Sequence, residues 1–307
     1  SEMCIRDRVR TITGVNVLED TVSLALDSAI LYPSTMRTDS ATASAVALLS
    51  RNIKLDVDAV AFTDNDPAMP QGGSLTVLAT PNIVQKIGGI EITRFGQVKK
   101  AYRHPIHFHM SGDVDGSIVA NNVIREAFYK CIVVQGTNNL LIADNIAYDT
   151  MGHCYTLQDG SESGNVFRGN MGANTMPIAA HLRLTGEPDH DPATFLISNT
   201  LNSWEGNRAA GSVSHGFWFE LRQFIRGLSA DRLIALGQPN PNGALQSQDL
   251  SLFKDNIAHS NGISGLKIRD YVPESEQMIE NLSLFRNTIG TQFSDSRNVV
   301  VAGLYAS

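Results

Sequence analysis

The sequence lacks several features that would each define a class of protein. It has no apolar run near the roughly 18 residues of a membrane-spanning helix and no opening typical of a secretory signal. Basic residues are not in excess, because 24 Lys and Arg stand against 31 Asp and Glu, a formal net charge of −7. General nucleic-acid binding needs basic patches that neutralise phosphates, so we expect no nucleic-acid partner.

Cysteine is scarce, with Cys4, Cys131 and Cys154 only and no C-x-x-C pair. Two cysteines in the body of the chain do not make a disulfide scaffold, so we expect Cys131 and Cys154 to be buried free thiols that act as small hydrophobes, with a disulfide between them as the less favoured alternative. Residues 1–10 (SEMCIRDRVR) resemble translated adaptor sequence. We expect them to be a non-native leader, and the chain to be a fragment with no membrane segment of its own.

An internal repeat determines the expected fold. Segments such as IVANNVI, LIADNIA and LFKDNIA share an Asn, and these Asn residues stand at 122, 145, 170, 207 and 256, with separations of 23, 25, 37 and 49. Short β-rich runs repeating about every 24 residues, with Asn and Gly at the turns, are typical of a β-solenoid. We therefore predict an all-β, right-handed parallel β-helix of the pectin-lyase-like kind.

The domain boundaries follow from the same repeat. Residues 67–307 are expected to form the β-helix, with insertions near 175–192 and 222–248. Residues 11–66 hold short strand-like runs and are expected to form a β-rich N-terminal cap, which would protect the open end of the solenoid.

The repeat also aligns polar residues. The positions eight residues after the repeated Asn are Lys130, His153 and His215, and the position one rung before Lys130 is His107, so these four residues should form one column. Six residues further along the chain, a second column should hold Asp113, Gly136 and Asp159. Side chains alternate along a strand, so apolar Phe108, Cys131 and Cys154 should face inward. By the same alternation, an outward face should carry the following residues: His107, His109, Lys130, His153 and Tyr155.

Three interpretations of this face remain open. In the first, His107, His109 and His153 are acid/base groups oriented by Asp113 and Asp159. In the second, His107, His109 and Asp113 hold a divalent metal, although Lys130 would repel a cation beside them. In the third, the face is simply polar. The substrate-binding candidates are Arg103, Lys130, Tyr155, His215 and Trp218, and the insertion at 175–192 could wall the same groove.

Several longer motifs occur in order: VALLSRNIKL (46–55), HPIHFHMSGD (104–113), MGHCYTLQDGSESGNVF (151–167) and FKDNIAHSNGISGLKI (253–268). Together they resemble the β-helix region of the G8-domain family, which includes the cell-migration-inducing hyaluronan-binding protein, the transmembrane cell-surface hyaluronidase and fibrocystin-L. The resemblance matches the family pattern at His107, His109, Asp113, His153, Asp159 and Gly160. It departs from that pattern at Ser74, where a His is common, and at Gln158.

The resemblance implies an extracellular or cell-surface protein that, as for some members of the family, binds and depolymerises hyaluronan or a similar polysaccharide. A hyaluronidase-like glycosidase and a lyase both fit that description. The alternatives are a non-catalytic module that binds a glycan or a protein, and a structural stalk segment. Family membership predicts fold better than reaction, so these stay separate hypotheses. Separately, we expect a monomer.

Overall fold

The computed structural model describes residues 9–29, 45–58, 70–80, 82–184, 186–187 and 189–306. Residues 1–8 of the predicted leader, and the predicted boundary at 66/67, lie outside the described residues. The chain divides into two compact units, Ser1–Val46 and Ala47–Ser307. In the first unit, β1 (Ile12–Leu18) and β2 (Thr21–Leu26) form an antiparallel hairpin.

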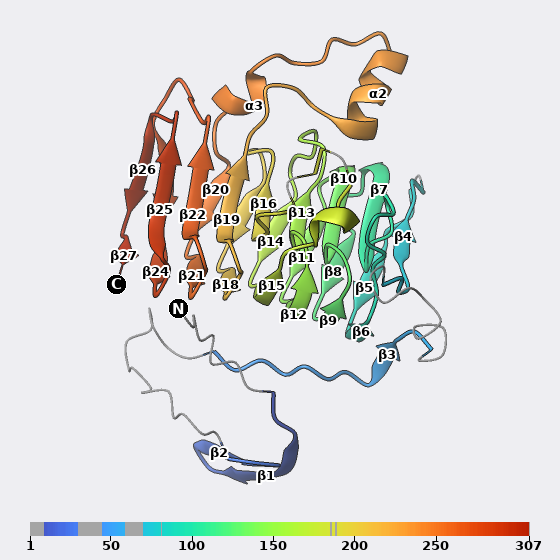
Figure 1. Cartoon of the computed structure of the whole chain (residues 1–307), viewed down its shortest axis with the longest axis vertical. Helices are drawn as coiled ribbons and strands as arrows, with labels where there is room; N and C mark the ends of the chain where they lie inside the picture. Colours follow the sequence, from blue (N-terminus) through green and yellow to red (C-terminus); the bar gives the residue numbers. More distant parts are fainter. Residues whose placement is uncertain are drawn as a thin grey trace. The chain divides into compact units, whose positions relative to one another are not determined.

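The second unit is a parallel β-helix, in which each coil contributes one strand to each of three parallel sheets (Figure 1). The first sheet contains β4 (Leu75–Val77), β7 (Ile106–Asp113), β10 (Ile132–Asn138), β13 (Tyr155–Leu157), β16 (Ala193–Ile197), β19 (His215–Glu220), β22 (Ser264–Arg269) and β25 (Ile289–Ser294). The second sheet contains β5 (Lys86–Gly88), β8 (Ile118–Ala120), β11 (Leu141–Ala143), β14 (Val166–Arg168), β17 (Ser203–Glu205), β20 (Leu252–Lys254), β23 (Gln277–Glu280) and β26 (Val299–Ala302).

The third sheet contains β3 (Ile53–Leu55), β6 (Ile90–Thr93), β9 (Val123–Ala127), β12 (Ile146–Met151), β15 (Met171–Met176), β18 (Arg208–Ala210), β21 (Ile257–His259), β24 (Ser283–Phe285) and β27 (Tyr305–Ala306). This architecture confirms the predicted all-β parallel β-helix.

The corner between the second and third sheets explains the Asn repeat. The residue before each repeated Asn has left-handed backbone, which Asn, Asp and Gly adopt most readily; examples are Asn121 (φ 58°), Asp144 (φ 53°) and Gly169 (φ 64°). The next residue is the repeated Asn, and it is fully buried in five successive coils. The sequence period is therefore the period of this corner.

The buried Asn side chains form a hydrogen-bonded ladder along the solenoid axis. The Asn145 Nδ2 donates to the Asn170 Oδ1 (3.0 Å) and to the Val119 carbonyl (2.8 Å). The Asn145 Oδ1 accepts from the Nδ2 of Asn122 at 3.0 Å. Every amide group is thus satisfied inside a core where an unpaired one would be costly.

The interior of the coil is apolar, with aromatic rings stacked from coil to coil. Tyr155 stacks on Phe195 (ring centroids 4.8 Å apart) and Phe195 on Phe217 (4.7 Å). These positions are paired across β13, β16 and β19. Tyr155 therefore points inward, and the prediction that it faces outward is wrong. Its hydroxyl lies 3.0 Å from the backbone carbonyls of both Asn145 and Met171, which share its single proton.

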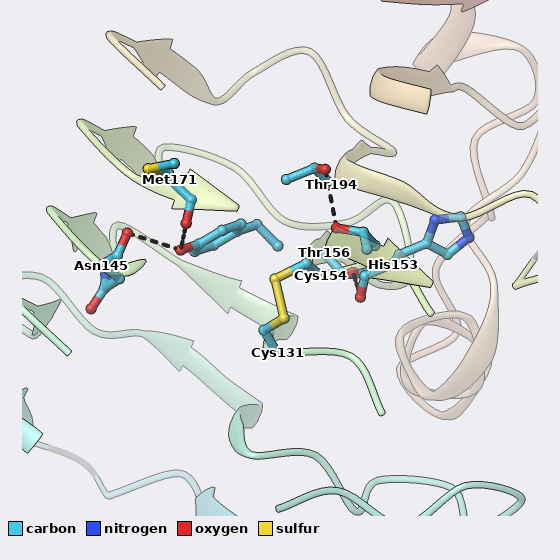
Figure 2. The surroundings of a disulfide bond; sticks show 9 residues. Cys131, Asn145, His153, Cys154, Thr156, Met171 and Thr194 are labelled. Carbon is cyan, nitrogen blue, oxygen red and sulfur yellow. Dashed lines mark hydrogen bonds between the residues drawn. A yellow bond between two sulfur atoms is a disulfide. The ribbon is translucent and has the colours of Figure 1, made fainter. Parts of the chain in front are cut away.

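The two inward-facing cysteines are joined. Cys131 and Cys154 occupy successive coils with their Cα atoms 4.5 Å apart, and they form a disulfide (Figure 2). The prediction of free thiols is therefore wrong. The prediction placed both side chains inward at neighbouring levels, and that stacking is the arrangement in which two thiols meet.

Two insertions interrupt the coils, and each is connected to a strand of the first sheet. The first insertion joins β15 to β16 and includes the 3₁₀ helix η1 (Ala180–Leu182). The second insertion joins β19 to β20 and includes α2 (Gly227–Ala235) and α3 (Ala244–Ser247). In Figure 1, α2 and α3 lie beyond the ends of the first-sheet strands.

Candidate functional site

The structure shifts part of the predicted His column. Ile106 pairs with Ile132, a separation of 26 residues, so His107 pairs with Val133 and not with Lys130. The next step, Ile132 to Tyr155, is 23 residues and keeps Lys130 and His153 in register, as predicted. A bulge in β7 then pairs Asp113 with Asn138 instead of Gly136.

His107 and His109 lie side by side on the outer face of β7, with ring centroids 4.9 Å apart. The His107 Nδ1 is 3.2 Å from the Tyr102 carbonyl, which can only accept, so Nδ1 carries the proton and Nε2 keeps a lone pair. That Nε2 is buried and has no hydrogen-bond partner among the residues that the structure describes. Burial, the largest cause, lowers the pKa of His107 to about 4.

His109 is the more accessible of the two, and a chain of hydrogen bonds holds it. Its Nδ1 donates to the Gln135 Oε1 (3.0 Å), and the Gln135 Nε2 donates to both carboxylate oxygens of Asp159 (3.2 Å each). Asp159 also accepts from the backbone N–H and hydroxyl of Ser229 on α2. The nitrogen of His109 that this chain of bonds leaves open is therefore Nε2. Gln135 orients the His109 ring, and Asp159 in turn orients Gln135.

Tyr102 covers the two histidines from the segment before β7. Its ring centroid is 4.9 Å from that of His109 and 6.2 Å from that of His107. Partial burial, followed by the negative charge of Asp159, raises the pKa of Tyr102. The tyrosine therefore keeps its proton at neutral pH, and its ring lies against that of His109.

Lys130 lies in a closed ionic cluster under the first insertion. Its side chain is 1% exposed, with Nζ 2.7 Å from the Glu187 Oε2 and 3.7 Å from the Asp189 Oδ1. Burial opposes ionisation of Lys130 and Glu187, but the attraction between opposite charges in the cluster outweighs it for these two groups. The pKa of Glu187 falls to about 2, and the pKa of Lys130 rises. Lys130 therefore ties the insertion to the sheet.

His153 belongs to the same cluster. Its Nδ1 accepts the backbone N–H of Ala193 (2.9 Å), so the proton is on Nε2, 3.7 Å from the Asp189 Oδ1. The ring points away from the disulfide (Figure 2). Complete burial, reinforced by the charge of Lys130, lowers the pKa of His153 well below its usual value. Both nitrogens of this neutral histidine therefore face protein groups.

His215 and Trp218 extend the same face towards the C-terminal coils. The Lys267 Nζ lies 3.9 Å from the centroid of the Trp218 ring and 3.3 Å from the Nε2 of His215. Trp218 is 7% exposed and His215 is 1% exposed. Burial, then Lys267, lowers the pKa of His215 to about 3. An open hollow of about 360 Å³ adjoins this cluster and is lined by Trp218, Glu220, Leu221, Arg222, Gln223, Gln246, Arg269 and Asp270.

Other predicted site residues lie elsewhere. Asp113 is at the exposed end of β7, where its carboxylate accepts from Asn139 (2.9 Å) and from the backbone N–H of Asp115 (3.1 Å). Arg103 is exposed beside the histidine cluster. In the described part of the chain no three His, Cys, Asp or Glu side chains are grouped to hold a metal ion. The predicted donor set of His107, His109 and Asp113 is therefore not assembled.

Sequence reasoning missed three residues that contact the predicted site residues. Tyr102 and Gln135 contact His109, and Glu187 contacts Lys130. Gln135 could have been found from the correct register, since it pairs with His109 across β7 and β10. Tyr102 and Glu187 come from irregular segments outside the repeat, so the period gave no signal for them.

These features define a class: a parallel β-helix whose first sheet carries a histidine-rich polar cluster, walled by two insertions. The chain belongs to the CEMIP beta-helix family, whose model matches residues 70–266. This finding confirms the family resemblance stated above.

Individual relatives agree. The chain is 30% identical over 257 residues to Cell surface hyaluronidase CEMIP2 of Homo sapiens, covering 73% of this chain and 18% of that protein. It is 32% identical over 232 residues to a G8 domain-containing protein of Dictyostelium discoideum (71% and 15%). It is 28% identical over 261 residues to Fibrocystin-L of Mus musculus (74% and 6%). The chain thus spans less than a fifth of each of these relatives. Within the described residues, no helix is long and apolar enough to cross a membrane.

Proposed function

We propose that this chain is an extracellular polysaccharide-cleaving β-helix, with hyaluronan or a similar glycan as its substrate. The observation that carries the proposal is the half-buried His109, whose Nδ1 is engaged by the Gln135–Asp159 pair and whose Nε2 is left to accept a proton. The relationship to a protein named as a hyaluronidase supports the substrate class.

Cleavage of a glycosidic bond needs a proton acceptor and a proton donor. In the proposed mechanism His109 accepts a proton at Nε2, from water in hydrolysis or from a sugar carbon in elimination. Tyr102 gives its proton to the sugar oxygen that leaves, and regains one from solvent. Arg103, exposed one residue away from Tyr102, is placed to bind a sugar carboxylate.

The buried residues take positioning roles in this proposal. His107, Lys130 and His153 are fully buried, so a polysaccharide reaches none of them in this conformation. Lys130 and His153 hold the first insertion against the sheet, and Asp159 anchors both Gln135 and α2. This division differs from the expectation that all the histidines act directly on substrate.

A second candidate is a non-catalytic glycan-binding module. The burial of His107, Lys130 and His153 favours it, because the surface then offers a glycan the His109 end of the cluster and the hollow beside Trp218. In that case the hollow and Arg103 would contact the glycan and no bond would break.

A size assay on high-molecular-weight hyaluronan separates the two candidates. We expect the unaltered chain to shorten hyaluronan, and His109→Gln to lose this activity at least 100-fold, since a general base typically contributes 10²–10⁴-fold. His259→Gln, which alters a histidine on β21 of the third sheet, is the matched control and should keep full activity. Hyaluronan bound but never shortened would establish the binding module.

A further inference from the structure

The chain contains a single Asn-x-Ser/Thr triplet, Asn281-Leu282-Ser283. Such a triplet is the acceptor sequence for N-linked glycans when its middle residue is not Pro, and it requires an exposed Asn in a secreted protein. Asn is common in this solenoid for a structural reason, so the triplet carries meaning only if the side chain is exposed.

The structure places Asn281 in an exposed turn between β23 and β24. Its backbone is left-handed (φ 50°), as at the equivalent corner of the other coils. Its Nδ2 donates a hydrogen bond to the Asp255 Oδ1 at 2.9 Å, and both residues are exposed. The ladder Asn residues differ, because their amides are fully buried and bonded on both sides.

The neighbours of Asn281 fix this turn. Leu282 is fully buried at the position that an Asn of the ladder occupies in other coils. Asn281 therefore stands at the left-handed corner position that precedes it. Ser283 is the first residue of β24 and is partly exposed. The acceptor amide and the hydroxyl residue that completes the triplet are thus both at the surface.

This corner joins the second and third sheets, and so lies across the coil from the first sheet. A glycan there would leave the His109 groove and the hollow beside Trp218 uncovered. A large sugar is therefore compatible with the proposed activity.

We propose that Asn281 is an N-glycosylation site. The donor class is an oligosaccharide carried on a lipid diphosphate. The Asn281 side-chain nitrogen bonds to the anomeric carbon and loses a proton, while the bond from that carbon to the diphosphate oxygen breaks and the diphosphate leaves with the electron pair. The inference rests on the extracellular placement proposed above, which the buried Cys131–Cys154 disulfide also favours, because such bonds form in the secretory pathway.

The test directs the chain into the secretory pathway of a eukaryotic cell with a fused signal peptide, and measures its intact mass before and after treatment with a peptide N-glycosidase. We expect one glycan, whose enzymatic release leaves Asp at position 281. Ser283→Ala should abolish the modification. Ser283→Thr is the matched control, because it keeps the hydroxyl at the same strand position and should keep the glycan.

An unmodified Asn281 in folded, secreted protein would overturn the inference. So would finding that the chain is degraded when it is directed to the secretory pathway but is obtained folded when it is expressed in the cytosol. Asn281→Asp gives a second check, since Asp tolerates the left-handed backbone but cannot accept the sugar. The hyaluronan size assay is scored separately, so Ser283→Ala protein that lacks the glycan and still cleaves would leave the proposed function intact.

Discussion

At the scale of single residues, the burial of neutral histidines links stability to pH. The pKa of His107 is lowered by burial from 6.5 to about 4. As the pH falls, the His107 side chain of the unfolded chain therefore binds a proton at a higher pH than that of the folded chain. The stability this residue contributes is present above about pH 6.5 and is lost as the pH falls through about 4. One unit of pKa difference corresponds to about 1.4 kcal/mol, so the loss is on the order of 3 kcal/mol.

We therefore expect the free energy of unfolding to fall as the pH is lowered between these values, and His107→Gln to reduce that slope. Urea unfolding at a series of pH values measures both. His190→Gln is the control, since its side chain is 53% exposed, and it should leave the slope unchanged. An equal slope in the His107 variant and the unaltered chain would refute the linkage.

At the scale of elements, the sequence predicted what the corners of the coil require. The left-handed corner residue and the buried Asn after it constrain residue type, so their spacing was visible in the sequence. The 26-residue step from Ile106 to Ile132 and the bulge in β7 have no residue signature, and these displaced His107 and Asp113 from their predicted columns. Burial of Lys130 and His153 was also hidden, because the covering insertion lies outside the repeat.

The Asn ladder gives a prediction at this scale. Asn145→Ala removes two donated hydrogen bonds, and the Val119 carbonyl and the Asn122 backbone N–H lose their Asn145 partner in the core. Each unsatisfied buried group costs about 1–3 kcal/mol, so for two groups we expect a loss of at least about 2 kcal/mol. Chemical denaturation measures it, with Asn52→Ala at an exposed position as the control. A loss below about 1 kcal/mol would show that water replaces the amide.

At the scale of the whole β-helix, stability depends on contacts between neighbouring coils, because each coil touches only the next. The junction of β10 and β13 is short, with three paired residues from Ile132 to Val134, and the Cys131–Cys154 disulfide crosses it. A crosslink closing a loop of this length typically stabilises by about 3 kcal/mol. We expect the double variant Cys131→Ala, Cys154→Ala to lower the free energy of unfolding by about that amount.

The disulfide is fully buried, so a reductant should act on it only after the chain opens. Folded protein treated with a thiol reagent should not react at Cys131 or Cys154, and reduction should lower the unfolding temperature of the unaltered chain but not that of the double variant. Labelling of Cys131 in the folded, unreduced protein would disprove the bond.

Because the coils couple only to their neighbours, weakening this junction should loosen β10 and β13 first. Hydrogen exchange should therefore rise at Ile132 and Tyr155 before it rises at the distant Leu266 of β22.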